Sequence, residues 1–228
     1  PGRIDLGLGR APGSDPVTSR ALNNDMSRAE NFPGEVTELQ TLLGPYNGTH
    51  PIRAIPGEDT NVPLWLLGSS LFSAQLAAQK GLPYVFAGHF APRFVHDAIA
   101  LYKREFKASN VLDKPYVMLA LPLVAAETDE EAQYLSTTSK QRVLELIRGK
   151  ELWLKPPVES MEGLWSEQER AHVENFLSLS VVGGHVSIKH KLEMIAKELE
   201  VDEFIFTNDV YDSEKRHRAL EILMEIKH

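Results

Sequence analysis

The sequence PLWLLGSSLFSAQLAA occupies residues 63–78 and combines two elements of secondary structure. Its apolar residues predict a strand over Val62–Leu67 that is buried on both faces, as strands of parallel sheets are. Residues Ser70–Lys80 predict a helix, and Gly81 stands where helices commonly end. A strand that runs directly into a helix is the repeating unit of parallel α/β folds, so this stretch decides the fold class.

The same alternation continues along the chain and predicts five strands in a single domain over residues 1–228. Thr128 and Asp212 are expected to cap the helices that follow them. We expect strands at Arg3–Gly9, Val62–Leu67, Tyr84–Phe90, Tyr116–Ala125 and Glu203–Thr207, with a short edge strand at Pro51–Ile55, and helices at Pro16–Asn24, Asn31–Leu43, Ser70–Lys80, Pro92–Phe106, Asp129–Arg148, Glu167–Leu179, Ser187–Glu198 and Ser213–Lys227. The segment Lys150–Ser166 contains prolines and reads as an irregular insertion.

Composition excludes several classes of protein. The 228 residues contain no cysteine, which rules out disulfides and thiolate chemistry. A net charge of −8 without a basic stripe argues against nucleic-acid binding. No apolar run approaches the about 18 residues of a membrane span, and the opening Pro-Gly-Arg is no secretory leader, so we expect a cytoplasmic protein that does not bind membranes.

The turn between the strand and the helix of residues 62–80 is a candidate anion site. A helix start offers free N–H groups and the positive end of the helix dipole. Gly68 allows close approach to the backbone, and Ser69, Ser70 and Ser73 add hydroxyl groups, a combination suited to phosphate. Serine at a helix start also serves as a plain cap, so the residues alone leave both interpretations open.

A second strand end, GLGRAPGSD at residues 7–15, places Arg10 at the edge where parallel sheets bind ligands. Its guanidinium suits bidentate pairing with a phosphate, although a surface ion pair would explain it too. Glycines at 7, 9 and 13 do not match the dinucleotide fingerprint, and there is no P-loop. Arg20 and Arg28 are further candidates for the same anion or for solvated helix charges.

Other polar residues follow strands and are candidates to line a site. His89 follows the third strand, and His185 and Tyr211 are candidates for the mouth of a barrel. Asp209 and Asp212 follow the last strand; we favour a capping role for Asp212 and a place in the pocket wall for Asp209. The chain has no paired histidines typical of zinc sites and no G-x-S-x-G elbow, so we expect neither a metal centre nor a serine hydrolase.

Several stretches together form a familiar pattern: GLGRAPG at 7–13, PLWLLGSS at 63–70, SAQLAA at 73–78, GLP at 81–83, AAETDEEA at 125–132, VG at 182–183 and TNDVYD at 207–212. In this pattern the chain resembles the bacterial luciferase-like family of flavin-dependent monooxygenases. The resemblance covers essentially the whole chain, and its middle segment is the most specific part. It implies a (β/α)8 barrel that uses reduced FMN, with the deazaflavin F420 as the less favoured cofactor, and O₂ to oxidise a small organic substrate.

The resemblance also implies roles for particular residues. The flavin phosphate is expected near Arg10, Ser69, Ser70 and Ser73, with Arg28 or Arg20 as a second arginine. Leu66, Leu67 and Gly68 are expected beside the flavin ring and ribityl chain. The resemblance identifies no catalytic residue in this chain; from its position His89 is a candidate for contact with substrate or flavin, or else a structural histidine. A flavin reductase and a second copy of the chain in a homodimer are the expected partners.

In the family, the strand Arg3–Gly9 resembles the fourth barrel strand. This chain is therefore expected to supply strands four to eight, with roughly 100 residues of the barrel missing before them. Two other hypotheses stay open at this point: a flavin-binding or assembly module without turnover, and a flavodoxin-like sheet of five strands. The second is less favoured, because flavodoxins place the phosphate loop after the first strand.

Overall fold

The computed structural model describes residues 2–11, 16–21, 30–48 and 50–226 as two compact units. The first unit comprises Pro1–Phe86 with Asp97–Val117, and the second comprises Ala87–His96 with Met118–His228. Each unit is described by itself below.

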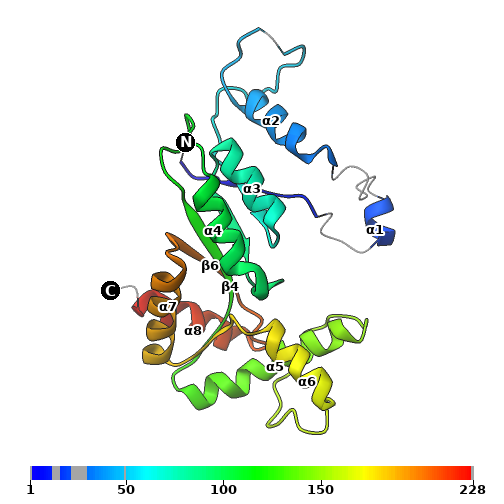
Figure 1. Ribbon diagram of the computed structural model, residues 1–228. Coiled ribbons are helices and arrows are strands. Elements are labelled where there is room, and N and C mark those ends of the chain that lie inside the picture. The colour runs from blue at the N-terminus through cyan, green and yellow to red at the C-terminus, as the bar shows by residue number, and fades with distance from the viewer. Residues whose placement is uncertain (1, 12–15, 22–29, 49, 227–228) are drawn as a thin grey trace. The chain divides into compact units, whose positions relative to one another are not determined.

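The first unit is built on three parallel strands, with Leu8 opposite Leu66 and Leu66 opposite Tyr84. Helix α3 packs on strand β2, which it follows directly, as Figure 1 shows in cyan. The elements are β1 (Leu6–Gly9), α1 (Pro16–Ala21), α2 (Phe32–Leu43), β2 (Leu64–Gly68), α3 (Leu71–Lys80), β3 (Tyr84–Ala87) and α4 (Val95–Glu105).

Two tyrosines in ring contact lie in the core of the first unit. Tyr84 and Tyr102 are both fully buried, with ring centres 5.3 Å apart. The Tyr102 hydroxyl donates to the Leu82 carbonyl at 2.9 Å and accepts from the Tyr116 N–H at 3.1 Å. It therefore joins the chain just before β3 to the chain just before β4.

The second unit is centred on the long strand β4, all of whose pairings described here are parallel. Residues Met118–Pro122 pair with β6, and Leu123–Ala125 pair with β5. Helices α5 and α6 pack together, and so do α7 and α8 (Figure 1). The elements are η2 (Pro92–Phe94), β4 (Val117–Ala125), α5 (Asp129–Ile147), α6 (Glu167–Phe176), β5 (Val181–Gly183), α7 (His185–Leu199), β6 (Glu203–Thr207) and α8 (Ser213–Ile226).

Local signals in the sequence placed most of these elements correctly. Gly81 ends α3 in the left-handed conformation, with φ of 61°. Thr128 accepts from the Glu131 N–H at 3.1 Å, and Asp212 accepts from the Lys215 N–H at 2.9 Å, so both are the predicted caps. The α/β class with parallel strands is likewise confirmed.

Several predictions differ from the structure. Pro51–Ile55 forms no strand, since Pro51 has no N–H to donate. Strand β3 stops at Ala87, where the Phe90 N–H donates to the Ala87 carbonyl at 3.1 Å and closes a turn. The helix predicted at Pro92 starts as a 3₁₀ turn and becomes α-helical at Val95, and α6 ends at Phe176. Strand β5 was not predicted, because its three residues are too few to show a pattern.

The segment Lys150–Ser166 contains no helix or strand, as predicted, yet it is bound to α5 by side chains of that helix. Thr138 donates its hydroxyl proton to the Lys155 carbonyl at 2.9 Å. Gln141 donates to the Pro156 carbonyl at 2.9 Å, and the Val158 N–H donates to the Thr137 hydroxyl at 2.9 Å. The insertion is therefore a fixed part of the second unit.

Glu169 ties the end of this insertion to α5 through its carboxylate. Arg148 donates to both carboxylate oxygens, at 2.7 and 3.0 Å, and the Ser166 N–H donates at 2.7 Å as part of a capping box. The hydrogen bonds from Arg148 and then from Ser166 lower the pKa of Glu169 from 4.5 to about 2.

We expect Glu169→Gln to reduce the fall in the free energy of unfolding that acid pH causes. Since the folded pKa is depressed, the contribution of the carboxylate is complete above about pH 4.5 and disappears as pH falls toward 2. Urea midpoints measured between pH 6 and pH 3 should therefore fall less in the variant. Glu162→Gln is the control, because Glu162 is exposed and pairs with Arg170 only at 3.9 Å. Equal slopes for wild type and Glu169→Gln would contradict the expectation.

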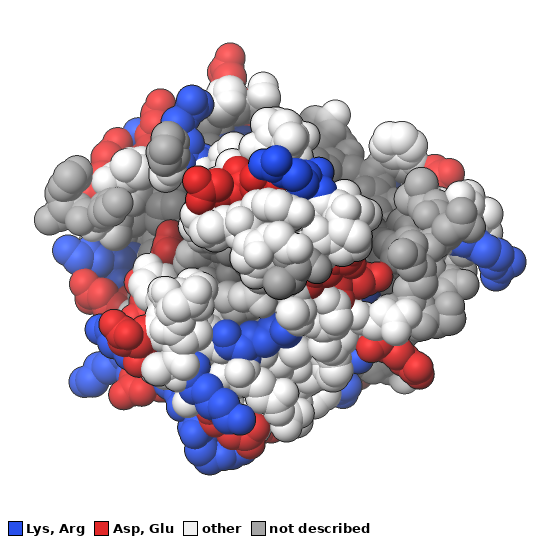
Figure 2. All heavy atoms as spheres, turned by 90° about the horizontal axis from the view of Figure 1, so that it is seen from above, with Lys and Arg blue, Asp and Glu red and all other residues white. Residues whose placement is uncertain are grey.

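Charge is mixed on the surface. On the face seen in Figure 2, lysine and arginine side chains lie among aspartate and glutamate side chains. None of the helices described is both long and apolar enough to cross a membrane.

Candidate functional site

The turn between β2 and α3 leaves polar groups free at the helix start. Ser70 is the N-cap in extended conformation, and its side chain makes no capping hydrogen bond. Ser73, one turn later, is buried and donates its hydroxyl proton to the Ser70 carbonyl at 3.0 Å. The first N–H groups of α3 and the Ser70 hydroxyl are thus available to an anion.

Gly68 is required by the close packing of this turn. A Cβ at this position would lie 2.0 Å from Ser73 Oγ and 2.6 Å from Ser73 Cβ. The Ser73 hydroxyl therefore occupies the place that any larger residue at position 68 would need. The absence of a side chain lets the first turn of α3 fold back against the end of β2.

A buried phenol lies behind the turn. The Tyr84 hydroxyl has no hydrogen-bond partner among the described residues, and burial raises its pKa well above the usual range. The Ser73 hydroxyl is near enough to moderate that rise, although the two groups make no hydrogen bond of normal geometry. The Ser70 hydroxyl in the turn therefore has no capping role, and the Tyr84 hydroxyl behind the turn has no partner among the described residues.

Arg10 lies beside the first turn of α3, as expected from its position at the end of the neighbouring strand. Its guanidinium carbon stands 4.1 Å from the centre of the Phe72 ring, on the first turn of α3. The side chain is exposed, so its guanidinium can be reached by a ligand. A cation, free helix N–H groups and serine hydroxyls therefore meet at one edge of the first unit.

The other predicted cofactor residues have different surroundings. Leu66 is fully buried, whereas Leu67 is half-buried and covers Gly7, where a Cβ would meet Leu67 Cδ1 at 2.8 Å. Ser69 is half-buried in the turn, and Arg20 is exposed at the end of α1. Arg28 lies outside the described residues.

The second unit contains a separate cavity of about 320 Å³. It lies between the turn after β3, the end of β6, and side chains of α5 and α6. Its lining consists of His89, Phe90, Ser139, Arg142, Val143, Leu146, Leu152, Phe176, Leu177, Thr207 and Asp209. Two residues predicted from the sequence, His89 and Asp209, thus line one cavity.

An ion pair, a histidine and the hydroxyls of Ser139 and Thr207 form the polar part of this cavity. Arg142 Nη1 lies 2.6 Å from Asp209 Oδ1, with side chains 39% and 31% exposed. His89 Nδ1 is buried without a hydrogen-bond partner in the described part of the chain. Burial lowers the pKa of His89, opposed by the Ala120 carbonyl and the Asp209 charge, so the imidazole is neutral at pH 7.

Gly88 allows the turn that carries His89 to lie against β4. A Cβ on Gly88 would stand 2.8 Å from the Ala120 carbonyl oxygen. The close approach explains why the turn can present His89 to both Ala120 and Asp209.

Three other predicted residues do not line this cavity. His185 Nε2 pairs with Glu225 at 2.7 Å at the start of α7. Asp212 caps α8, and Tyr211 is 47% exposed beside it. Arg142 was missed by sequence reasoning; its only signal was its place on the α5 face with Ser139, Val143 and Leu146.

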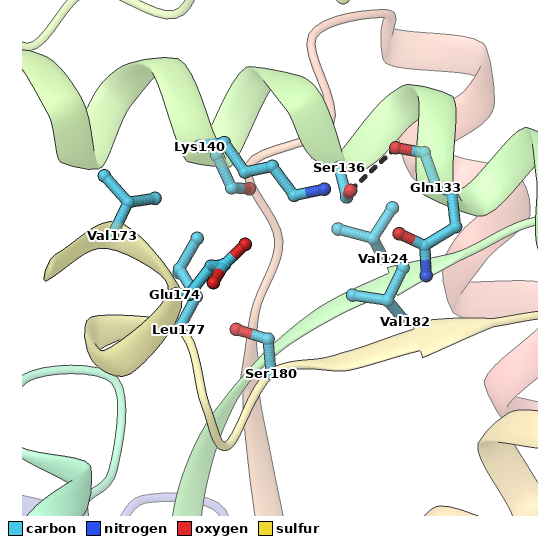
Figure 3. A pocket seen from close by; sticks show the side chains of 10 residues that line it. Val124, Gln133, Ser136, Lys140, Val173, Glu174, Leu177, Ser180 and Val182 are labelled. Carbon is cyan, nitrogen blue, oxygen red and sulfur yellow. Dashed lines mark hydrogen bonds between the residues drawn. The ribbon is translucent and has the colours of Figure 1, made fainter. Parts of the chain in front are cut away.

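A smaller cavity of about 170 Å³ lies beside it between α5, α6, β4 and β5. Ser139 and Leu177 line both cavities. Figure 3 shows Lys140 extended across the smaller one, above the Glu174 carboxylate, and burial lowers the pKa of Lys140. Within the described residues, no group of three acidic or histidine side chains could hold a metal ion.

The comparisons with known proteins agree on a family. The model for the luciferase-like monooxygenase family matches residues 1–201. An uncharacterised Bacillus subtilis protein, YvbT, is 46% identical over 99% of this chain, and an Escherichia coli K12 protein named luciferase-like monooxygenase is 42% identical over 100%. The chain spans 68% of the length of each of these two relatives.

Solved structures show the same fold. The apo-MsnO8 crystal structure superposes with a TM-score of 0.84 at 26% identity, over 100% of this chain and 69% of that one. More distant structures share the fold alone: the oxygenating constituent of 3,6-diketocamphane monooxygenase in complex with FMN (TM-score 0.64, 13% identity, over 97% of this chain and 69% of that one) and an F420-dependent reductase from Methanopyrus kandleri (0.60, 15%, over 97% and 72%). These neighbours are luciferase-like barrel enzymes, which decides against the flavodoxin-like alternative. The chain belongs to the luciferase-like monooxygenase family.

Proposed function

We propose that this protein is an FMN-dependent monooxygenase that uses reduced flavin and O₂ to oxidise a small organic molecule. The observation that carries the proposal is the anion site of the first unit, where Arg10 stacks over Phe72 beside the unsatisfied start of α3. Family membership supports the reaction type, and the FMN in a structure of the same fold supports the cofactor.

The residues of the β2–α3 turn fit the phosphate end of a flavin. A phosphate at the helix start would accept hydrogen bonds from backbone N–H groups and from the Ser69 and Ser70 hydroxyls. Arg10 would neutralise its charge, and Gly68 leaves room for Ser73 and the first turn of α3 at the end of β2. Leu67, half-buried above Gly7, offers an apolar surface to the rest of the cofactor.

Reduced flavin, when bound, supplies the electrons that activate O₂, and the protein supplies position and surroundings. The cavity of the second unit would hold the substrate against apolar side chains and keep water away from it. His89 would contribute a neutral imidazole ring to the wall of this cavity, with its Nδ1 buried away from the substrate.

An F420-dependent oxidoreductase is the second candidate, supported by the Methanopyrus kandleri structure of the same fold. Oxidation of reduced FMN with O₂ uptake favours the monooxygenase, whereas hydride transfer with F420 favours this alternative. Flavin binding without either reaction would favour a flavin-binding module without turnover.

We also propose that β1 to β4 and β6 correspond to barrel strands four to eight. A flavin reductase and a homodimer remain predictions.

FMN titration followed by quenching of flavin fluorescence tests the cofactor assignment. We expect binding by the wild type and about tenfold weaker binding by Arg10→Met, because a charged hydrogen bond to phosphate is lost. Arg93→Met is the matched control, since Arg93 also stacks on an aromatic ring, Phe94 at 4.4 Å, in the other unit. If neither FMN nor F420 binds the wild type, the proposal is wrong.

A further inference from the structure

We propose that Tyr84 is a positioning residue for the cofactor phosphate, and that its phenol acts through the Ser73 hydroxyl on the first turn of α3. This role rests on the proposed function, since the phosphate in question is that of the flavin. The phenol oxygen is too deeply buried to touch a ligand, so its effect on binding is indirect.

Tyr84 lies on the face of the sheet that α3 covers. It is the residue of β3 opposite Leu66 of β2, and residues in register on parallel strands project to the same face. Gly68, two residues after Leu66, faces the same way, and a Cβ there would meet Ser73 Oγ at 2.0 Å. The Tyr84 side chain and the Ser73 hydroxyl are therefore both enclosed between β2, β3 and α3.

The Tyr84 hydroxyl is a buried donor without an acceptor. The side chain is fully buried, and its oxygen has no hydrogen-bond partner in the described part of the chain. An unpaired buried polar group destabilises a protein, whereas phenylalanine would fill the same space without that penalty. The hydroxyl thus adds nothing to the packing of β3, which points to a role that appears when a ligand binds.

Ser73 offers the acceptor that the phenol lacks. Burial raises the pKa of Tyr84 well above the usual range and the nearby Ser73 hydroxyl lowers it in part, so the two groups are close and the phenol keeps its proton. The single proton of the Ser73 hydroxyl goes to the Ser70 carbonyl at 3.0 Å, while its oxygen can still accept. A small shift of the first turn of α3 would complete a chain from Tyr84 through Ser73 to Ser70.

The chain ends at the peptide group that faces the ligand. The Ser70 carbonyl shares a peptide plane with the N–H of Leu71, the first residue of α3, and an N–H at this position has no acceptor within its helix. A phosphate that accepts from Leu71 fixes this peptide from outside, and Ser73 fixes it from inside. Hydrogen bonds that follow one another strengthen each other, so the phenol raises the affinity of the turn for phosphate.

Titration with FMN and with riboflavin, which lacks the phosphate, separates this role from a general effect on the fold. We expect Tyr84→Phe to bind FMN about fivefold more weakly than the wild type, through the loss of one hydrogen bond, and riboflavin equally well. Tyr134→Phe is the control, since it removes an exposed phenol from the second unit and should change neither affinity. Thermal melts verify that both variants are folded.

Ser73→Ala and the double variant Tyr84→Phe/Ser73→Ala test the route through Ser73. Ser73→Ala should also weaken FMN binding, and the added Tyr84→Phe should weaken it no further, because the phenol has already lost its acceptor. Losses that multiply in the double variant would contradict this route. The comparison uses FMN alone, so it decides the question even if riboflavin binds too weakly to be measured.

The role of Tyr84 and the cofactor assignment fail in different ways. An unchanged ratio of FMN to riboflavin affinity in Tyr84→Phe would overturn the role, including the case in which both flavins bind more weakly by the same factor. FMN binding by the wild type, weakened in Arg10→Met, would then still support the cofactor. If the wild type does not bind FMN, both proposals are wrong.

Discussion

Gly68→Ala is expected to lower the affinity for FMN by about 100-fold, through the loss of about two charged hydrogen bonds to phosphate. The new Cβ would stand 2.0 Å from Ser73 Oγ and 2.6 Å from Ser73 Cβ, so the first turn of α3 must move away from β2. That movement breaks the bond from Ser73 to the Ser70 carbonyl and turns the helix N–H groups away from the phosphate. FMN titration measures the loss, and a thermal melt shows whether the variant is folded.

Two further variants separate this mechanism from a general effect of the added methyl group. Gly34→Ala adds a Cβ within α2 that meets no atom within 4 Å, so FMN affinity should stay unchanged. The double variant Gly68→Ala/Ser73→Gly removes the clashing atoms and should recover part of the affinity. Wild-type FMN binding by Gly68→Ala would show that the phosphate lies elsewhere.

The β2–α3 turn could be predicted from the sequence because each of its signals is local. The apolar run, the Gly-Ser-Ser step and Gly81 lie within twenty residues and fix a strand, a helix start and a helix end. The position of Arg10 beside the first turn of α3, at Phe72, was also predictable, since parallel pairing brings successive strand ends to one edge.

The cavity of the second unit could not be predicted in the same way. Its ion pair joins Arg142 on α5 to Asp209 after β6, two residues 67 positions apart. No local pattern distinguishes Arg142 from an ordinary exposed helix cation, and the partner is fixed only when the helix packs. His89 was identified, but its unpaired Nδ1 depends on a turn that the sequence placed inside a strand.

Tyr102→Phe is expected to lower the free energy of unfolding by about 2 kcal/mol, because a buried carbonyl and a half-buried N–H lose a partner. The hydroxyl bonds the Leu82 carbonyl at 2.9 Å and the Tyr116 N–H at 3.1 Å, and the side chain is fully buried. Urea unfolding followed by circular dichroism measures the difference.

Tyr84→Phe is the matched control, since the Tyr84 ring contacts the Tyr102 ring and is equally buried but its hydroxyl bonds no described group. Removing an unsatisfied phenol should change stability by no more than about 0.5 kcal/mol or raise it. Equal losses in the two variants would contradict the expectation, because both changes preserve the ring and only the Tyr102 hydroxyl bonds the backbone. A loss confined to Tyr102→Phe would show that one hydroxyl joins the segments leading into β3 and β4.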